Sequence, residues 1–365
     1  MLDVSGMQWL TRLIILLWVV ALTHPGFAAD TTGGAQEQAQ RQITQPANNA
    51  PFWRDVRRGE STYQRTQVRG VETNVLIQTE GQTWRLLRPP VYSVGGVIVM
   101  LALLGILGYY LWRGSIKLHE PPTGRLIRRF SDLDRFTHWT VAISFVTLAI
   151  TGVIMTFGKY LLLPVFGYTL FSWLAIFAKN LHNFVAPVFL LALPLLIVVF
   201  IRDNWLKRYD IEWLKTFGGM LSKTGTEVPS GRFNAGEKAV FWVMVCILSV
   251  VLCISGVVML FANFEQGRVT MQSANIVHIV AALLAIAMAI FHIYLGTIGM
   301  KGAYKAMRTG YVDETWAREH HEIWYEEVKA GTARQQFAEN VPPRIRMQVE
   351  QSVDQGISGA MPRER

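Results

Sequence analysis

Charge is scarce in this 365-residue chain: 17% of the residues are charged, whereas 51% are hydrophobic. A soluble protein of this length has roughly a quarter of its residues charged, so the shortage indicates an integral membrane protein. The formal net charge is +9, but the basic residues gather in short loops between apolar runs. That placement reports membrane topology rather than a polyanion-binding surface, and no nucleic acid is expected as a partner.

Cysteine is equally scarce, and Cys246 and Cys253 are the only two in the sequence. They lie in one apolar run, about 10 Å apart along a helix, which is too far for a disulfide. We interpret both as small packing residues. The lack of a CxxC pair excludes an iron–sulfur cluster and a structural zinc site, and the lack of CxxCH excludes a covalently attached c-type haem.

The first 29 residues have the pattern of a secretory signal peptide. Arg12 precedes an apolar stretch from Leu13 to Leu22, and small residues end at Ala28-Ala29. An uncleaved anchor helix is the alternative interpretation. In either case the polar segment that follows, residues 30–90, is expected outside the cytoplasm.

Within that exported segment, residues 73–78 and 83–86 flank Glu80-Gly81-Gln82. The pattern predicts a small β-hairpin, and Pro89-Pro90 is expected to end the segment.

Five runs without Lys, Arg, Asp or Glu are long enough to cross a membrane, since about 20 residues at about 1.5 Å each span a core of about 30 Å. The runs are Val91–Trp112, Phe136–Phe157, Leu181–Ile201, Ala239–Ala262 and Ser273–Met300. A basic stretch, residues 113–135, separates the first run from the others. We therefore predict an all-α integral membrane fold, with one accessory transmembrane helix at 91–112 and a four-helix transmembrane bundle within 136–300.

Lys and Arg are unevenly distributed among the connecting segments. They are concentrated in 113–135, 202–238 and the tail 301–365, whereas 158–180 and 263–272 contain few. The positive-inside rule places the first three in the cytoplasm, C-terminus included, and the other two outside. In the tail, a short amphipathic helix is expected at Glu319–Val328, and the residues after about 330 are expected to be loose.

Four histidines lie within the bundle spans, where ionisable side chains are expensive and therefore indicate function. They are His138, His182, His278 and His292. The last two share one span, and fourteen residues correspond to about 21 Å of rise and nearly four full turns, so they face one side at opposite depths. His182 matches the depth of His278, and His138 that of His292. Each pair is expected to supply the two axial ligands of the iron in a b-type haem, giving two haems in all.

A single metal ion or a proton relay fits the four histidines less well. The pairs are about 20 Å apart, too far for one ion, and the spans contain no Asp or Glu for a relay. Gly152, fourteen residues after His138, either leaves room for a flat ring or packs two helices tightly. A haem-free membrane transporter or assembly scaffold remains an alternative of a different class.

Residues 125–330 resemble the cytochrome b (gamma) subunit of membrane-bound bacterial formate dehydrogenases, and residues 1–112 are similar to the extension of its longer-form members. The resemblance rests on several fragments taken together: Arg135-Phe136-Thr137-His138-Trp139, Asn180-Leu181-His182-Asn183-Phe184, Arg232-Phe233-Asn234-Ala235-Gly236-Glu237-Lys238, Val277-His278, His292-Ile293-Tyr294, Lys301-Gly302, Trp316-Ala317-Arg318-Glu319-His320-His321 and Trp324-Tyr325.

The resemblance implies an electron-transfer subunit in the bacterial inner membrane that is no enzyme on its own. Its partners would be an iron–sulfur beta subunit and a molybdenum- or tungsten-containing alpha subunit on the outer side. Electrons would enter at the haem of His182 and His278 and leave from that of His138 and His292. A quinone, menaquinone or ubiquinone, would accept them on the cytoplasmic side. The cytochrome b of a nickel–iron hydrogenase or of another respiratory oxidoreductase is the nearest alternative.

The resemblance also implies that Asn234 and Gly236 contribute to the quinone site. A structural interpretation is compatible with that role, because Asn234 and Glu237 have the spacing of a capping box at a helix N-terminus. His320 and His321 have no partner within the spans, and we interpret them as surface residues.

Overall fold

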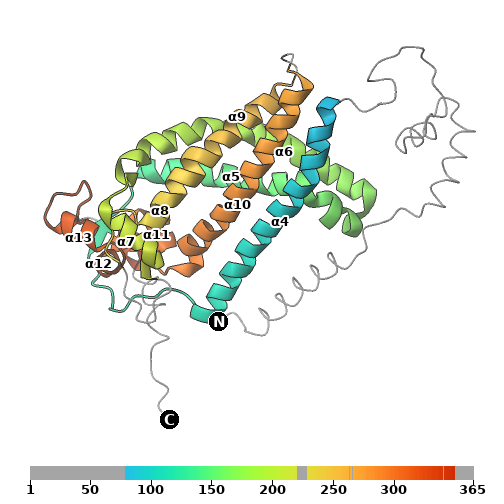
Figure 1. Ribbon diagram of the computed structural model, residues 1–365. Helices are drawn as coiled ribbons and strands as arrows, with labels where there is room; N and C mark the ends of the chain where they lie inside the picture. Colours follow the sequence, from blue (N-terminus) through green and yellow to red (C-terminus); the bar gives the residue numbers. More distant parts are fainter. Residues whose placement is uncertain (1–78, 220–227, 263, 265, 340, 350–365) are drawn as a thin grey trace, which may run out of the picture. The chain divides into compact units, whose positions relative to one another are not determined.

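The computed structural model describes residues 79–219, 228–262, 264, 266–339 and 341–349 (Figure 1). The predicted signal peptide and the first strand of the predicted hairpin lie outside these ranges. The chain divides into two units. The described part of the first comprises residues 79–83 and 157–173, which belong to the ends of three helices: α4 (Thr79–Arg113), α5 (Asp132–Leu161) and α6 (Leu163–Phe200). In this unit Gly167 has a φ of 70°, a left-handed conformation that glycine adopts without strain, and α6 is kinked there.

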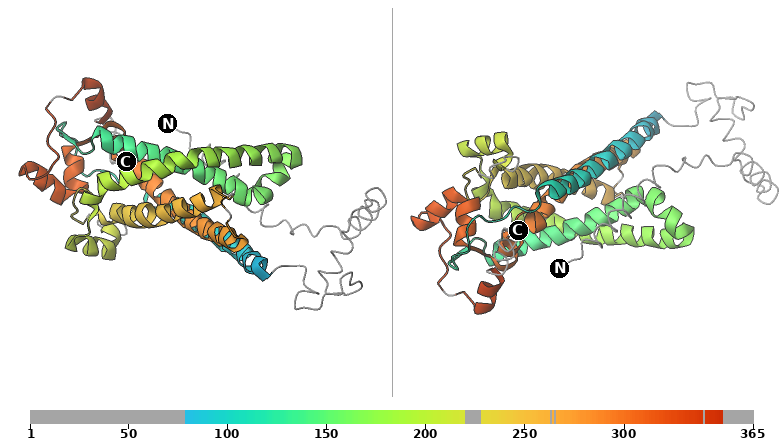
Figure 2. Two further views of the ribbon diagram at one scale, coloured as in Figure 1. Left: turned by 90° about the horizontal axis from the view of Figure 1, so that it is seen from above. Right: turned by 90° about the horizontal axis from the view of Figure 1, so that it is seen from below.

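The second unit contains the remaining described residues and all four intramembrane histidines. After α6, the next long helix is continuous from α8 (Ala235–Ala239) through the π-helical η3 (Val240–Leu248) to α9 (Ser249–Leu260). The last long helix consists of α10 (Arg268–Tyr294) and the π-helical η4 (Leu295–Gly299). Within this unit α9 runs beside α10, and α5 runs beside α6 (Figure 2).

Among the described residues, five helices are long and apolar enough to span a membrane. These are Thr83–Arg113, Asp132–Leu161, Leu163–Asn204, Ala235–Leu260 and Arg268–Gly299. They coincide with the five predicted runs and confirm the all-α membrane fold. Many of their large apolar side chains are exposed, such as Ile143 and Leu191, as expected for surfaces that meet lipid tails.

The accessory helix α4 begins earlier than the sequence suggested. It passes through Pro89 and Pro90, so the expectation of a hairpin strand at 83–86 is wrong. Proline fixes φ near the helical value, and a helix tolerates it where the neighbouring structure holds the chain. Here the Trp84 indole donates to Asn275 Oδ1 on α10 at 3.1 Å. At the other end Tyr109 meets Tyr294 edge to face, with ring centroids 6.4 Å apart.

The predicted cytoplasmic segments fold together at one end of the second unit. Strands β1 (Leu126–Arg128) and β2 (Tyr311–Asp313) pair antiparallel. Around them lie α11 (Ala303–Thr309), α12 (Glu314–His320), α13 (Glu322–Lys329), the 3-10 turns η1 (Ile201–Asn204) and η2 (Phe217–Gly219), and α7 (Arg208–Thr216).

The chain after residue 330 is packed rather than loose, at least to residue 349. The Ala338 amide donates to the Leu126 carbonyl at 2.8 Å, and Val341 and Val349 are buried against Leu126. The expected helix at Glu319–Val328 is broken at His321, which separates α12 from α13.

Candidate functional site

The first histidine pair consists of His182 on α6 and His278 on α10, whose ring centroids are 6.3 Å apart. A hydroxyl group touches the Nδ1 atom of each ring. Thr151 Oγ1 on α5 lies 2.8 Å from His182 Nδ1, and Ser255 Oγ on α9 lies 3.0 Å from His278 Nδ1. Four helices therefore contribute to this pair, and the Nε2 atom of each ring is left for another partner.

A glycine follows each of these hydroxyl residues and borders the same imidazole. A Cβ atom added at Gly152 would lie 3.7 Å from His182 Cε1, and one added at Gly256 would lie 3.4 Å from His278 Cε1. The sequence singled out Gly152 as a source of space. The structure places it beside the His182 ring, on the helix adjacent to that histidine.

The second pair consists of His138 on α5 and His292 on α10, with ring centroids 6.1 Å apart. In this pair, His138 Nδ1 is buried without a hydrogen-bond partner in the described structure. A cavity of about 180 Å³ borders both rings. Its walls are mainly apolar side chains of α5, α6, η3 and α10, Phe145 and Phe189 among them.

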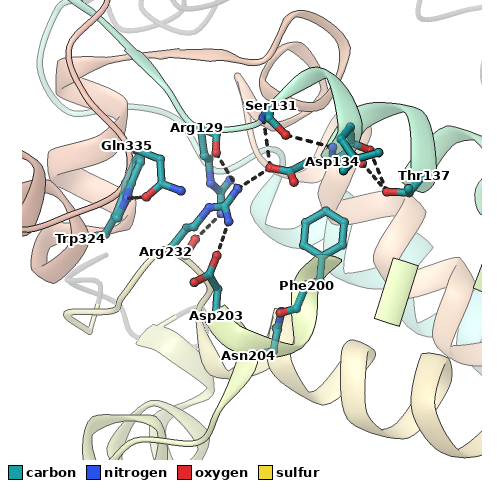
Figure 3. Close-up of polar contacts among 11 residues, drawn as sticks. Arg129, Ser131, Asp134, Thr137, Phe200, Asp203, Asn204, Arg232, Trp324 and Gln335 are labelled. Carbon is teal, nitrogen blue, oxygen red and sulfur yellow. Dashed lines mark hydrogen bonds and ion pairs between the residues drawn. The ribbon is translucent and has the colours of Figure 1, made fainter. Parts of the chain in front are cut away.

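Asn204, at the end of η1, is a cavity residue that the sequence reasoning missed. It is 2% exposed, and its Oδ1 atom is buried without a partner among the described residues. Its Nδ2 donates to the Phe200 carbonyl at 2.9 Å (Figure 3), and its own carbonyl accepts from the Trp242 indole at 2.8 Å. An uncharged polar residue three positions after the end of a membrane run was the available signal, because such a side chain lies at the border of the bundle.

The Asn234 loop, residues 233–237, includes the first turn of α8 and carries the two predicted quinone residues, Asn234 and Gly236. The capping box is confirmed: Asn234 Oδ1 accepts from the Glu237 amide, and Glu237 Oε2 accepts from the Asn234 amide, both at 2.9 Å. A Cβ atom at Gly236 would lie 2.8 Å from the Trp213 ring, so glycine is needed for this approach. Phe233 and Glu237, from the same loop, line the cavity at His138 and His292.

Two buried arginines form ion pairs beside this loop. Arg232 pairs with Asp134 at 2.8 Å and with Asp203 (Figure 3). Arg129 pairs with Glu237 at 3.1 Å. Each arginine also donates to the backbone carbonyl of the other, at 2.8 and 2.7 Å. Burial lowers the pKa of Arg129, and the neighbouring Glu237 acts in the opposite direction.

The interpretation of His320 and His321 as surface residues is wrong, since they are 5% and 1% exposed. His321 Nδ1 lies 2.8 Å from the Gly231 carbonyl, and Ser230 Oγ donates to the His320 carbonyl at 2.9 Å. The corner between α12 and α13 therefore holds the start of the loop that leads to Asn234. Burial, and then the charge of Arg129, lowers the pKa of His321 well below its usual value.

Among the described residues, no three His, Cys, Asp or Glu side chains gather as a metal site would require. What the helices bring together is two imidazole pairs inside an apolar bundle. That arrangement defines the class of membrane-bound b-type cytochromes.

Comparison with known proteins identifies the family. The family described as prokaryotic cytochrome b561 matches residues 129–310. The cytochrome b556(Fdn) subunit of the nitrate-inducible formate dehydrogenase of Escherichia coli strain K12 is 29% identical over 222 residues, which are 60% of this chain and 98% of that protein. The cytochrome b556(fdo) subunit of a formate dehydrogenase of the same strain is 30% identical over 217 residues, 57% and 96% of the two chains. The cytochrome b556 subunit of a Haemophilus influenzae formate dehydrogenase is 26% identical over 202 residues, 53% and 79%.

The chain belongs to this family of cytochrome b subunits of formate dehydrogenases. Membership implies that it binds haem b and that it is an electron-transfer subunit in a membrane.

Proposed function

We propose that this protein is the dihaem cytochrome b subunit of a formate dehydrogenase complex in the bacterial inner membrane. It carries electrons from a periplasmic iron–sulfur subunit to a quinone on the cytoplasmic side, and a molybdenum or tungsten subunit oxidises formate. The relatives named as formate dehydrogenase subunits support the choice of complex. The spacing of the two imidazole pairs is the observation that carries the dihaem assignment.

The histidine residues fit a six-coordinate haem iron. Two metal–nitrogen bonds of about 2 Å, extended by the distance from each nitrogen to its ring centre, put two axial imidazole centres about 6 Å apart. The centroid distances are 6.3 Å for His182 with His278 and 6.1 Å for His138 with His292. Haem, when bound, supplies a one-electron redox centre at each pair.

Each ligand role follows from where the helices hold the rings. α10 contributes one histidine to each pair, α6 contributes His182 and α5 contributes His138. The cavity at His138 and His292 has mainly apolar walls, which suit the flat apolar face of a macrocycle. A chain that holds two such sites at opposite depths of one bundle provides a path across the bilayer.

The quinone is assigned to the end of the molecule where Asn234 and Gly236 lie. Support comes from the residues on either side of them, since Phe233 and Glu237 border the cavity at the His138/His292 pair. By the positive-inside rule this end faces the cytoplasm, from which quinone would take its protons. The buried arginines and carboxylates fix the loop, because each is held by at least one partner of opposite charge.

The proposal is tested in native membranes that contain the whole complex. Formate is expected to reduce the haem absorption bands, and added menaquinone or ubiquinone is expected to reoxidise them. Hydrogen in place of formate is the matched control, because a hydrogenase subunit would respond to hydrogen instead. Reduction by hydrogen alone would contradict the formate assignment, and absence of any haem band would leave a transporter or scaffold as the better description.

A further inference from the structure

We propose that Thr151 and Ser255 are positioning residues of the His182/His278 pair. Each hydroxyl accepts a hydrogen bond from the Nδ1–H group of one imidazole, which directs the bare Nε2 nitrogen toward the haem iron. This inference rests on the proposed haem site, and it goes further by assigning a role to two hydroxyl residues on helices that carry neither histidine.

The direction of the hydrogen bonds follows from where the hydroxyl protons go. Thr151 Oγ1 donates to the Thr147 carbonyl at 2.8 Å, and Ser255 Oγ donates to the Val251 carbonyl at 2.6 Å. A hydroxyl has one proton and two lone pairs, so each oxygen is left as an acceptor for the ring it touches. The Nδ1 atom must then carry the proton. In this neutral tautomer the Nε2 atom has the free lone pair, which can bind a metal.

The same two-residue arrangement occurs twice in the bundle. Thr151-Gly152 on α5 faces His182, and Ser255-Gly256 on α9 faces His278. In each case the hydroxyl holds the Nδ1 atom of the ring, and the glycine lets the backbone approach the Cε1 atom. The two elements together fix the position and the tilt of a ring, which is what a metal ligand requires.

Ordinary helix packing does not account for these contacts. A buried serine in an apolar helix bonds back to its own helix, as Ser144 does to the Thr140 carbonyl at 2.7 Å. Thr151 and Ser255 make that bond and also reach a histidine of the neighbouring helix. At the other pair, His138 Nδ1 has no such partner in the described structure.

A physical consequence distinguishes positioning from packing. An acceptor on Nδ1–H makes the imidazole a more basic ligand, which stabilises ferric iron over ferrous iron. Loss of the acceptor should therefore raise the midpoint potential of the haem at His182 and His278. The haem at His138 and His292 should keep its potential.

The test uses Thr151→Val and Ser255→Ala in the complete complex, with redox titration of the haem bands and haem content per polypeptide. We expect a higher midpoint potential for one haem in each variant, and haem release faster by about tenfold or more, the usual scale for loss of such a partner. Thr151→Ser should restore both values. Thr147→Val, whose exposed hydroxyl donates to the Ile143 carbonyl at 2.8 Å, is the matched control and should change neither.

Unchanged potential and release rate in both variants would overturn the inference. Ser255→Ala only removes an atom, so it decides the matter if Thr151→Val fails to accumulate. His278→Ala separates the positioning role from the haem site itself. If it removes a haem while the hydroxyl variants change nothing, the haem site stands and the positioning role is wrong. If it removes no haem, the proposed function itself fails.

Discussion

The two histidine pairs have nearly equal ring separations and very different surroundings. At His182 and His278 the Nδ1 atoms meet neutral hydroxyls of neighbouring helices at 2.8 and 3.0 Å. At His138 and His292 a cavity borders the rings, and the nearby loop is held by the ion pairs of Arg129 with Glu237 and of Arg232 with Asp134 and Asp203. The His182/His278 pair is thus oriented by hydrogen bonds within the bundle. The His138/His292 pair lies beside a group of charged residues from distant parts of the chain, which we call the charged cap: Arg129, Asp134, Asp203, Arg232 and Glu237.

The difference indicates a division of labour along α10. A site that only passes electrons needs rigid ligands, and neutral hydroxyls supply rigidity without placing charge in the membrane. Under the proposed function, the His138/His292 site also exchanges protons with a quinone, which requires polar groups nearby. The charged residues around Asn234 and Glu237, at the start of α8, would supply them.

The largest effect is expected from removal of Arg232 from the charged cap. Arg232→Ala leaves Asp134 and Asp203, whose side chains are only 13% and 19% exposed, without their guanidinium partner, and removal of one member of such a pair costs up to about 3–5 kcal/mol. We expect a much lower thermal unfolding temperature of the detergent-solubilised protein, measured by differential scanning fluorimetry. Arg318→Ala is the matched control, because Arg318 and Glu120 are exposed and such a pair contributes below about 1 kcal/mol. Equal losses in the two variants would show that the cap does not depend on burial.

A second prediction concerns the pH dependence of stability. It involves His321, whose pKa is affected by Arg129 of the charged cap. The pKa of His321 is lowered by burial, so the folded protein binds fewer protons there than the unfolded chain does. Stability should be complete above the unfolded pKa of about 6.5 and should fall as the pH drops below it, by at most about 1.4 kcal/mol per pH unit.

His321→Asn keeps a donor for the Gly231 carbonyl but cannot titrate. The variant should therefore lose less stability than the wild-type protein as the pH falls below 6.5. Unfolding of both proteins is measured at pH 7.5, 6.5 and 5.5. An identical slope in the two proteins would contradict the prediction.

The smallest expected effect probes the hydroxyl-bound pair. A methyl group at Gly256 would lie 3.4 Å from His278 Cε1, whereas one at Gly152 would lie 3.7 Å from His182 Cε1. Gly256→Ala should therefore disturb its ring more than Gly152→Ala, each by less than about 1.5 kcal/mol. Electron paramagnetic resonance of the ferric haem reports ligand orientation and should shift more in Gly256→Ala. A larger shift in Gly152→Ala would contradict the ranking.

Sequence reasoning predicted the parts of the molecule that depend on local pattern. The membrane spans follow from uninterrupted apolar runs, and the capping box at Asn234 follows from its spacing with Glu237. Helical rise along the last span, together with the topology of the spans, matched His278 with His182 and His292 with His138, and the structure brings together those same pairs.

The errors arose where tertiary contacts outweigh local signals. Pro89-Pro90 suggested an end, but α10 holds α4 in helical form through both prolines. His320 and His321 looked exposed because nothing in the sequence shows that Ser230 and Gly231 lie against them. Thr151 and Ser255 were overlooked for the same reason, because the spacing of residues along the sequence does not show which hydroxyl contacts a histidine on another helix.

Haem content per polypeptide in single histidine variants tests the dihaem assignment most directly. Wild-type protein should contain two haems, and His278→Ala and His292→Ala should each retain one, with the remaining absorption band differing between the variants. Each variant should lose the haem of its own pair alone. Two haems in either variant, or loss of the same haem in both, would contradict the assignment.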